Sequence, residues 1–428
     1  MTHVPSTRRS VLRAAGAASL GALVPSIVTA QGAALETKAA KLGFIALVDA
    51  AALFVADEKG YFKKHGMTEV EVAKQSSWGT TRDNLVLGSK SGGIDGAHLL
   101  TPMAYLLTTG AVTANNVPVP MQILARLNLG GQCISVANEY KELKVGLDNK
   151  AFGRALLAKR VKTGKPVNAA MTFPGGTHDL WLRYWMAAGG VDPNRDISTI
   201  VVPPPQMVAN MKVGSMDAFC VGEPWNGQLA NQKIGYTALT TSELWMNHPE
   251  KAFALRADYV QANPNASRAL LKAVMEAQMW CEERGNRAEL AEICSRRRWI
   301  SAPVEDIAGR VRGDFDYGTG RVDTNSKYQM RFWADQASYP FPSHDLWFLT
   351  EDIRWGYLPP STDTKALIAK VNREDLWRAA AKELGVAAKD VPAGTSRGIE
   401  RFFDGKVFDP NDPKKYLDSL AIKAVKAA

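Results

Sequence analysis

Short apolar runs alternate with amphipathic stretches in the part of the chain that follows position 40. An apolar run covers 42–47, and Val70 and Val72 then alternate with acids, as in a half-buried strand. The stretch 82–87 has a helical pattern, and 94–98 again has the character of a strand and a turn. Strands and helices that alternate in this way predict α/β layers with a largely parallel sheet.

The same alternation returns in the middle of the chain, and a chain of 428 residues is long enough for two or more lobes. The later part is richer in helix and ends in a loop-rich tail. The expected strands are 166–173, 197–202 and 216–221; the expected helices begin at Thr177 or cover 206–213, 265–284 and 364–388; the tail is 402–415.

Charge and cysteine content narrow the possible partners only slightly. The net charge is +9, but like charges do not form blocks, so no nucleic-acid partner is expected. After the N-terminus no apolar run reaches the ~18 residues of a membrane-spanning helix. The four cysteines form no C-x-x-C pair, and both a disulfide and buried free thiols stay open; they are Cys133, Cys220, Cys281 and Cys294.

The first 30 residues predict an export signal. Arg8 and Arg9 precede a weakly apolar run at 14–28, and small residues end the segment at Ala30. A basic start, a short apolar run and a small-residue exit are the parts of a secretory signal, and paired arginines are typical of the bacterial twin-arginine route for folded cargo. We therefore expect a periplasmic protein whose signal is removed near Ala30. The alternative is a basic amphipathic helix of a cytosolic protein. No cysteine follows the cleavage point, so no lipid anchor is expected.

Common enzyme signatures are missing from the sequence. There is no H-E-x-x-H, G-x-S-x-G, Walker loop or G-x-G-x-x-G, and the histidines have no metal-type spacing. No catalytic residue, metal or cofactor is therefore expected, and a binding protein is favoured over an enzyme.

The loop 77–81 is the first candidate binding element. It follows a strand and opens a helix, so free backbone N–H groups near Gly79 and Thr80 form an anion site. The indole of Trp78 offers a further donor. The alternative is that the threonines only cap the helix and that Trp78 packs in the core.

The loop 173–178 has the same strand, glycine turn and helix start about 100 residues later. His178 falls in the first helical turn, although a histidine at a helix start is often only part of the surface. Two such loops in two α/β halves favour a shared anion cleft, because α/β ligands bind beyond the strand ends. Gln132, Lys251 and the turn 223–225 carry no functional signal by composition alone.

These segments nevertheless carry a resemblance. The motifs W-G-T-T-R-D-N-L at 78–85, P-G-G-T-H-D-L-W at 174–181 and D-A-F-C-V-G-E-P-W-N at 217–226 resemble the nitrate-binding proteins of ABC-type nitrate importers. The similarity runs from about Lys41 to the C-terminus. It implies an α/β periplasmic binding protein of type II, with two lobes, a two-strand hinge and the ligand in the cleft. Lobe 1 would be 31–128 plus 253–428, and lobe 2 would be 129–252.

The resemblance also implies a ligand site. Related bicarbonate-binding proteins carry an acid at the position of Lys251, where it works with calcium, so the lysine favours nitrate without a metal. We expect Lys251 to be the main charge partner, with no acidic metal ligand nearby, and His178 to add charge. The residues implied to bind nitrate are Trp78, Gly79, Thr80, Gln132, His178 and Lys251.

The implied function is that of a monomeric receptor. It would capture nitrate, with nitrite as a second candidate, and deliver it to a membrane permease and its ATPase. The alternatives are a receptor for bicarbonate or a small sulfonate and, in another class, a nitrate sensor that controls a regulator. The export signal separates the receptor from a cytosolic sensor.

Overall fold

Two five-stranded sheets organise residues 34–425, the part of the chain that the computed structural model describes. The predicted export signal therefore lies outside the described residues. One strand in each sheet, β10 or β5, is antiparallel to both of its neighbours. The expected α/β layers with largely parallel sheets are confirmed. The orders are β2-β1-β3-β10-β4 and β7-β6-β8-β5-β9.

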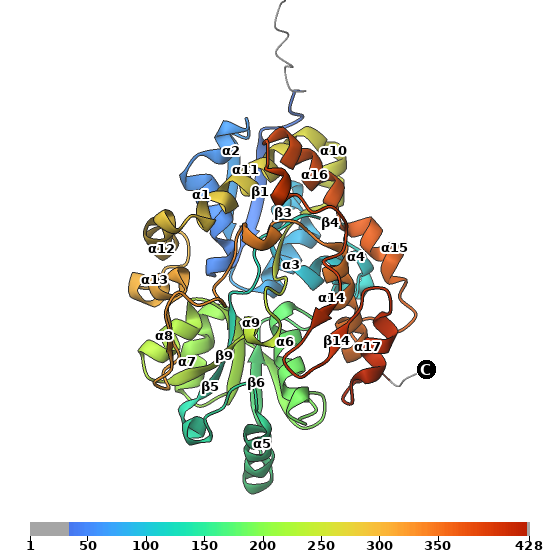
Figure 1. Ribbon diagram of the computed structural model, residues 1–428. Helices are drawn as coiled ribbons and strands as arrows, with labels where there is room; N and C mark the ends of the chain where they lie inside the picture. The colour runs from blue at the N-terminus through green and yellow to red at the C-terminus, as the bar shows by residue number, and fades with distance from the viewer. Residues whose placement is uncertain (1–33, 426–428) are drawn as a thin grey trace, which may run out of the picture. The chain divides into compact units, whose positions relative to one another are not determined.

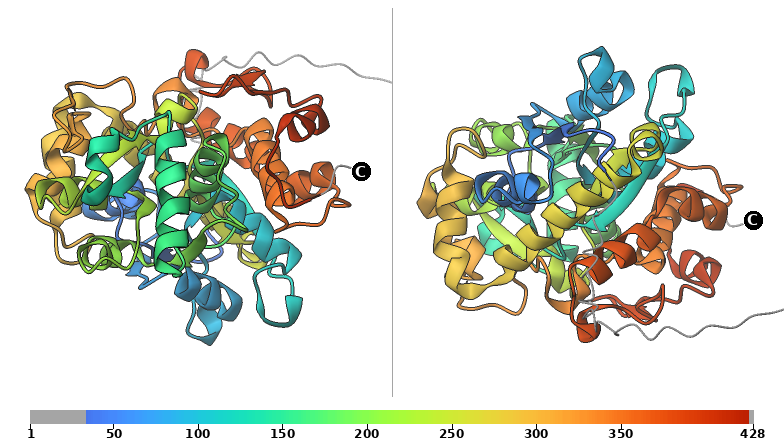
Figure 2. Two further views of the ribbon diagram at one scale, coloured as in Figure 1. Left: turned by 90° about the horizontal axis from the view of Figure 1, so that it is seen from below. Right: turned by 90° about the horizontal axis from the view of Figure 1, so that it is seen from above.

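The first sheet and its helices form the first lobe, in the upper part of Figure 1. Its strands are β1 (Ala39–Phe44), β2 (Glu69–Lys74), β3 (Gly96–Leu100), β4 (Met121–Arg126) and β10 (Lys251–Arg256). Helices α1 (Ala51–Glu58), α2 (Tyr61–Lys64), α3 (Trp78–Leu87) and α4 (Thr101–Thr109) follow its strands. After β10 come α10 (Ala257–Ala262) and α11 (Pro264–Glu282), which crosses this lobe diagonally in the right view of Figure 2.

The second sheet and its helices form the second lobe. Its strands are β5 (Gln132–Ala137), β6 (Asn168–Met171), β7 (Ser198–Val201), β8 (Ala218–Gly222) and β9 (Gly235–Thr240). Its helices are α5 (Lys150–Thr163), α6 (Thr177–Ala188), α7 (Met207–Lys212), α8 (Trp225–Asn231) and α9 (Thr241–Leu244). Next along the chain, α12 (Arg287–Ser295) packs against α1 of the first lobe, whereas α13 (Val304–Arg312) and β11 (Phe315–Asp316) pack against α8, and β12 (Val322–Asp323) pairs with β11.

Three chain segments meet where the lobes join. The chain crosses from β4 to β5 and returns from β9 to β10, as a two-strand hinge requires. A third segment adds to them, because Leu129 and Arg331 exchange backbone hydrogen bonds of 2.9 and 3.1 Å. Gly130 also donates to the carbonyl of His248 at 3.0 Å. The hinge therefore contains the two expected strands and a third segment, the chain near Arg331, which pairs with one of them.

The two lobes contact each other directly on the far side of the hinge. The N–H of Val48 donates to the carbonyl of Glu223 at 2.8 Å, and the indole of Trp225 donates to the carbonyl of Ala46 at 3.0 Å. The turn 223–225, which carried no signal in the sequence, thus joins the second lobe to the loop that follows β1.

The C-terminal segment packs against both lobes. Helix α14 (Pro342–Trp355) contacts α4 of the first lobe, and its Trp347 and Phe348 belong to the buried cluster of the second lobe. Figure 1 shows α14 beside this interface, with the tail next to α6. The lobe boundaries stay a prediction. The segment also contains α15 (Thr364–Val371), α16 (Glu374–Glu383), β13 (Glu400–Arg401), β14 (Val407–Phe408) and α17 (Pro413–Ser419).

The helix expected at 364–388 is present as two helices, α15 and α16, because the chain leaves the helical conformation at Asn372. This residue is extended and its side-chain amide donates to the carbonyl of Pro340 and to Asp345 at 2.7 and 2.6 Å. The next N–H, of Arg373, donates to the carbonyl of Ile123 in β4 at 2.9 Å. Tertiary hydrogen bonds thus override a pattern that is helical on both sides.

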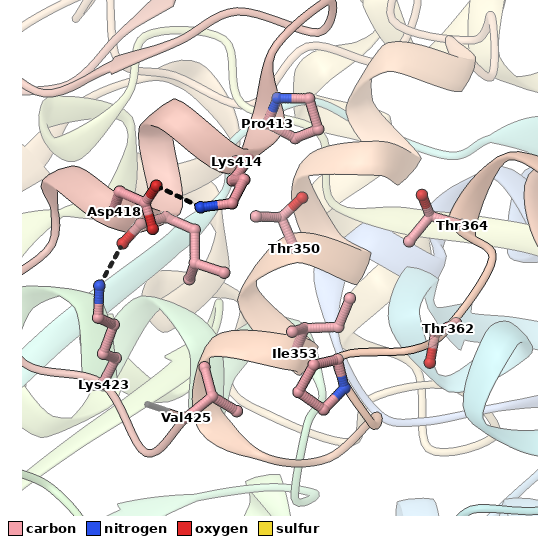
Figure 3. Close-up of a pocket in the computed structure, with 11 residues that line it drawn as sticks. Thr350, Ile353, Thr362, Thr364, Pro413, Lys414, Asp418, Lys423 and Val425 are labelled. Atoms are coloured by element: carbon pink, nitrogen blue, oxygen red, sulfur yellow. Dashed lines mark hydrogen bonds and ion pairs between the residues drawn. The ribbon is translucent and has the colours of Figure 1, made fainter. Parts of the chain in front are cut away.

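Other features of the described residues lie away from the lobe interface. A cavity of about 300 Å³ opens between α14 and α17, with Ile353, Leu417 and Val425 in its lining, and Figure 3 shows these surroundings. None of the predicted site residues lines it. No described helix is long and apolar enough to cross a membrane. All four cysteines are buried free thiols in this structure.

Candidate functional site

Lys251 lies at the centre of a buried polar cluster between the lobes. It is the first residue of β10, and its ammonium has no solvent exposure. Its Nζ lies 2.5 Å from Oε2 of Glu250, 3.0 Å from Oδ2 of Asp49 and 3.3 Å from Nε2 of His178. Burial alone would lower the pKa of Lys251, but the two carboxylates raise it above its usual value. The lysine is therefore a fixed positive charge.

Gln132 and His178 bring the second lobe to this cluster. The amide of Gln132, at the start of β5, donates to Oδ2 of Asp49 at 2.9 Å, which turns its oxygen toward His178. Nε2 of His178 lies 2.7 Å from that oxygen and must carry a proton to donate to it. The other ring nitrogen lies 2.6 Å from the hydroxyl of Thr172, which can then donate to it. The pattern is that of a neutral imidazole.

The expectation that His178 adds positive charge is wrong for the ligand-free protein. Its ring is completely buried, and burial together with the charge of Lys251 holds its pKa well below the usual value. A neutral ring can still donate one hydrogen bond from Nε2. Its contribution to anion binding is therefore directional.

Asp49 ties the first lobe into the cluster. It lies just after β1, and its second oxygen, Oδ1, is 2.7 Å from Nε2 of His98 in β3. Burial would raise the pKa of Asp49, but Lys251 and His98 lower it far below the usual value. The carboxylate is therefore ionised, and both of its oxygens already accept hydrogen bonds.

Glu250 is the second buried acid beside Lys251. Its oxygens accept from the hydroxyl of Thr177 at 2.9 Å and from the indole of Trp181 at 2.6 Å, in addition to the lysine. Burial raises the pKa of Glu250, and Lys251 opposes that rise. Because three donors face this carboxyl group, we describe it as a carboxylate.

These two acids correct the expectation that no acidic metal ligand lies near Lys251. One ligand atom from each of Asp49, His178 and Glu250 can be chosen so that all three lie within 4.8 Å of one another, which is a spacing that could hold a metal ion. The ammonium of Lys251 contacts all three groups. The absence of a metal requirement stays a prediction.

The loop at the start of α3 approaches the cluster through Trp78. This side chain is completely buried and its ring lies 5.2 Å from that of His98. Its indole N–H has no acceptor among the described residues. Since a buried donor without a partner is costly, this N–H is available for a ligand.

Gly79 and Thr80 differ from each other in what they can offer. A methyl group on Gly79 would meet only Oγ of Ser77, at 3.6 Å, so the backbone is open there. The N–H of Thr80 is already taken, because it donates to Oγ of Ser77 at 3.0 Å. The expectation of a free N–H at Thr80 is therefore wrong, since the helix cap uses it.

The comparisons with known proteins can now be set beside this geometry. The family model for the NMT1-like family matches residues 33–295. The chain belongs to the NMT1-like family. Within that family it is 56% identical to the nitrate/nitrite binding protein NrtA of Synechocystis sp. (strain PCC 6803), over 99% of each chain. It is 44% identical to the bicarbonate-binding protein CmpA of Synechococcus elongatus, over 92% of this chain and 89% of CmpA.

A solved structure agrees with the NMT1-like assignment. The crystal structure of the periplasmic nitrate-binding protein NrtA from Synechocystis PCC 6803 superimposes with a TM-score of 0.88 and 59% identity. It covers 91% of this chain and 100% of that chain. The resemblance to nitrate-binding proteins and the two-lobed binding-protein fold are confirmed.

Sequence reasoning found part of this cluster and missed its acids. Gln132 and His178 are joined by a hydrogen bond, Gln132 and Lys251 share Oδ2 of Asp49, and Trp78 packs against His98, the other partner of Asp49. Gly79 and Thr80 make no hydrogen bond to that group in the described residues. The missed residues are Asp49, His98, Thr172, Thr177 and Glu250; the position of Asp49 just beyond a buried strand was the one signal available in the sequence.

Proposed function

We propose that this protein is the substrate-binding component of an ABC-type importer for nitrate, with nitrite as a second ligand. The observation that carries the proposal is Lys251, a buried cation in a cleft where groups of both lobes converge. The high identity to NrtA over the full length supports the same ligand class. A binding role, rather than catalysis, agrees with a site whose polar groups are held by one another.

Nitrate suits the donors that this cleft offers. The ion is planar and weakly hydrated, and it accepts hydrogen bonds in its own plane. The indole of Trp78 and the N–H of Gly79 come from the first lobe, and Nε2 of His178 comes from the second. Lys251 adds a charge-assisted bond, which is about twice as strong as a neutral one. Gln132 must turn its amide oxygen away, so that its NH₂ can face the anion.

Lobe closure belongs to this proposal because direct contacts alone give modest affinity. Four ligand atoms at a ceiling of about 1.5 kcal/mol each give about 6 kcal/mol, which corresponds to tens of micromolar. Tighter binding requires water to leave the cleft, which lowers the local dielectric. The contacts of Val48 and Trp225 across the cleft support such a closed state.

We further propose that the protein works as a monomer in the periplasm, where it delivers the anion to a permease and its ATPase. The twin-arginine signal at 1–30 supports export in the folded state. It also argues against a cytosolic nitrate sensor, which needs no such signal. No step of this proposal requires a cofactor.

Replacement of Lys251 tests the proposed ligand site. We expect Lys251→Glu and Lys251→Met to weaken nitrate binding by on the order of a hundredfold or more, because the buried carboxylates then face the anion without a cation. Isothermal titration calorimetry gives the affinity, and circular dichroism checks the fold. The control is Lys90→Glu, which makes the same charge change at an exposed position. Equal nitrate affinity in folded Lys251→Met and wild type would contradict the proposal. Because no metal requirement is expected, a chelator should leave the nitrate affinity of wild type unchanged.

A bicarbonate receptor is the second candidate, and one observation favours it. The spacing of Asp49, His178 and Glu250 could hold a metal ion, and CmpA is a relative. Titration of bicarbonate with and without calcium separates the two candidates. Calcium-dependent bicarbonate binding without nitrate binding would replace the first proposal with this one.

A further inference from the structure

The charges around Lys251 are unusual for an anion site. One ammonium faces two carboxylates, Asp49 and Glu250, and all three are completely buried. The hydrogen bonds of His178 are those of a neutral ring, and Nδ1 of His98 has no acceptor among the described residues, so neither ring offsets the second acid. The cluster therefore carries one more negative than positive charge before an anion arrives.

Neither carboxylate is free to accept a hydrogen bond from a ligand. Asp49 already accepts from His98, Gln132 and Lys251. Glu250 has Thr177, Trp181 and Lys251 as donors. The two acids therefore act on a bound anion through their electric field, which repels it.

A bound anion would lie close enough to Asp49 for this repulsion to weaken its binding. Oδ2 of Asp49 lies 2.9 Å from the amide nitrogen of Gln132 and 3.0 Å from Nζ of Lys251. An anion held by either donor would be one further hydrogen bond away, at about 6 Å or less. At an effective dielectric of about 20, the charge of Asp49 by itself disfavours each additional unit of anion charge at that distance by on the order of a hundredfold and offsets the attraction of Lys251.

We propose that Asp49, supported by Glu250, is a specificity-determining residue that restricts this site to singly charged oxyanions and rejects doubly charged ones. The inference rests on the proposed function and names its substrate class. A fixed repulsive element weakens every anion, but it weakens a dianion twice as much on a free-energy scale, and such differences create specificity. Sulfite, carbonate and sulfate are thereby excluded from the cleft.

The structure shows why Asp49→Asn is a clean probe of this charge. The asparagine oxygen can take the place of Oδ2 and accept from Gln132 and Lys251. Its NH₂ group then faces Nε2 of His98, which must become an acceptor. That change of tautomer places the ring proton on Nδ1, which has no acceptor among the described residues, so the variant should lose some stability, a cost that is the same for both probe anions.

Chlorate and sulfite are the probe pair, because they are pyramidal oxyanions of the same shape that differ by one charge. Calorimetric titrations use a pH well above the second pKa of sulfurous acid. In wild type we expect chlorate to bind and sulfite to bind at least a hundredfold more weakly. Asp49→Asn should reduce the ratio of the two dissociation constants at least tenfold, and Glu250→Gln should shift it in the same direction.

The control variant is His98→Gln, which removes a partner of Asp49 without changing the charge. The ratio of its chlorate and sulfite dissociation constants should stay within threefold of the wild-type ratio. The inference is wrong if wild type binds sulfite as tightly as chlorate, if Asp49→Asn leaves the ratio unchanged, or if His98→Gln shifts it equally. A wild type that prefers chlorate over sulfite but fails to bind nitrate or nitrite would support the inference while refuting the proposed function.

Discussion

The starts of α3 and α6 have the same sequence pattern and opposite states in the structure. At α3 the indole of Trp78 has no acceptor among the described residues, although the helix cap already uses the N–H of Thr80. At α6 the polar groups are committed to partners inside the protein. Thr177 and Trp181 donate to Glu250, and Nε2 of His178 lies 2.7 Å from the amide oxygen of Gln132.

The two helix starts therefore have different roles at the site. The start of α3 supplies a neutral donor that has no acceptor among the described residues, whereas the start of α6 holds the carboxylate of Glu250 in place. A helix start with glycine and hydroxyl residues is therefore suited to bind an anion, but it does not always do so. Which helix start binds, and which one organises, depends on partners far away in the sequence. Changes on the α6 side should thus alter stability, and changes on the α3 side should alter affinity.

Acid should give the largest difference between the two sides. His248 packs against Trp181 and His344 against Trp245, with ring centroids 4.3 and 5.8 Å apart. Burial lowers the pKa of each histidine to about 3. Because the unfolded chain takes up these protons near pH 6.5 and the fold does not, stability is full above that value and falls as the pH drops toward 3. We expect a loss of about 2–4 kcal/mol between pH 7 and pH 5.

Urea unfolding at several pH values measures this loss, and amide hydrogen exchange locates it. Exchange should rise in α6 before it rises in α3. A double variant, His248→Gln with His344→Gln, should flatten the pH dependence. Constant stability down to pH 5 would contradict the assignment of these two rings as neutral and buried.

Trp181→Phe should give the next largest effect, and it should act on stability. The variant keeps the aromatic packing against Trp347 but removes the donor to the carboxylate of Glu250. Loss of a partner for a buried charged group typically costs about 1–3 kcal/mol. Chemical denaturation without nitrate measures the cost. Unchanged stability would show that Glu250 does not need this hydrogen bond.

Trp78→Phe is the matched variant on the α3 side. The variant loses the packing of a buried ring, as Trp181→Phe does, but no hydrogen bond within the described residues, so its loss of unfolding free energy should be smaller by about 1 kcal/mol or more. Nitrate affinity should fall by about tenfold, as expected for a lost hydrogen bond to an anion. Calorimetry and denaturation on the same samples give both numbers. A stability loss equal to that of Trp181→Phe would remove the proposed distinction between the two helix starts.

Much of the fold follows from local pattern. Alternating segments predicted both α/β layers, and the glycine-containing loops marked the starts of α3 and α6 correctly. Local pattern failed where distant backbone competes, as at Asn372, which the first sheet draws out of a helix. The third segment of the hinge near Arg331 was hidden for the same reason.

The site was predictable in its donors but not in its charges. The resemblance named Lys251 and Gln132, but it gave no reason to expect two acids against one lysine. Asp49 lies about 200 residues before Lys251, and only the assembly of β1, β3 and β10 into one sheet brings them to 3.0 Å. The neutral state of His178 depends on burial, which a single sequence does not display. Electrostatics of this kind requires the three-dimensional neighbours.

The split packing of the C-terminal segment has a consequence for synthesis. The buried cluster of the second lobe is completed by Trp347, Phe402, Phe408 and Leu420, which are made more than 100 residues after the last strand of that lobe. During synthesis on the ribosome, the aromatic face of α6 therefore stays exposed until almost the entire chain has emerged. Truncation before Phe402 should leave that apolar face exposed and make the product prone to aggregation. A carrier that accepts only folded cargo would then transport complete chains and leave nascent ones behind.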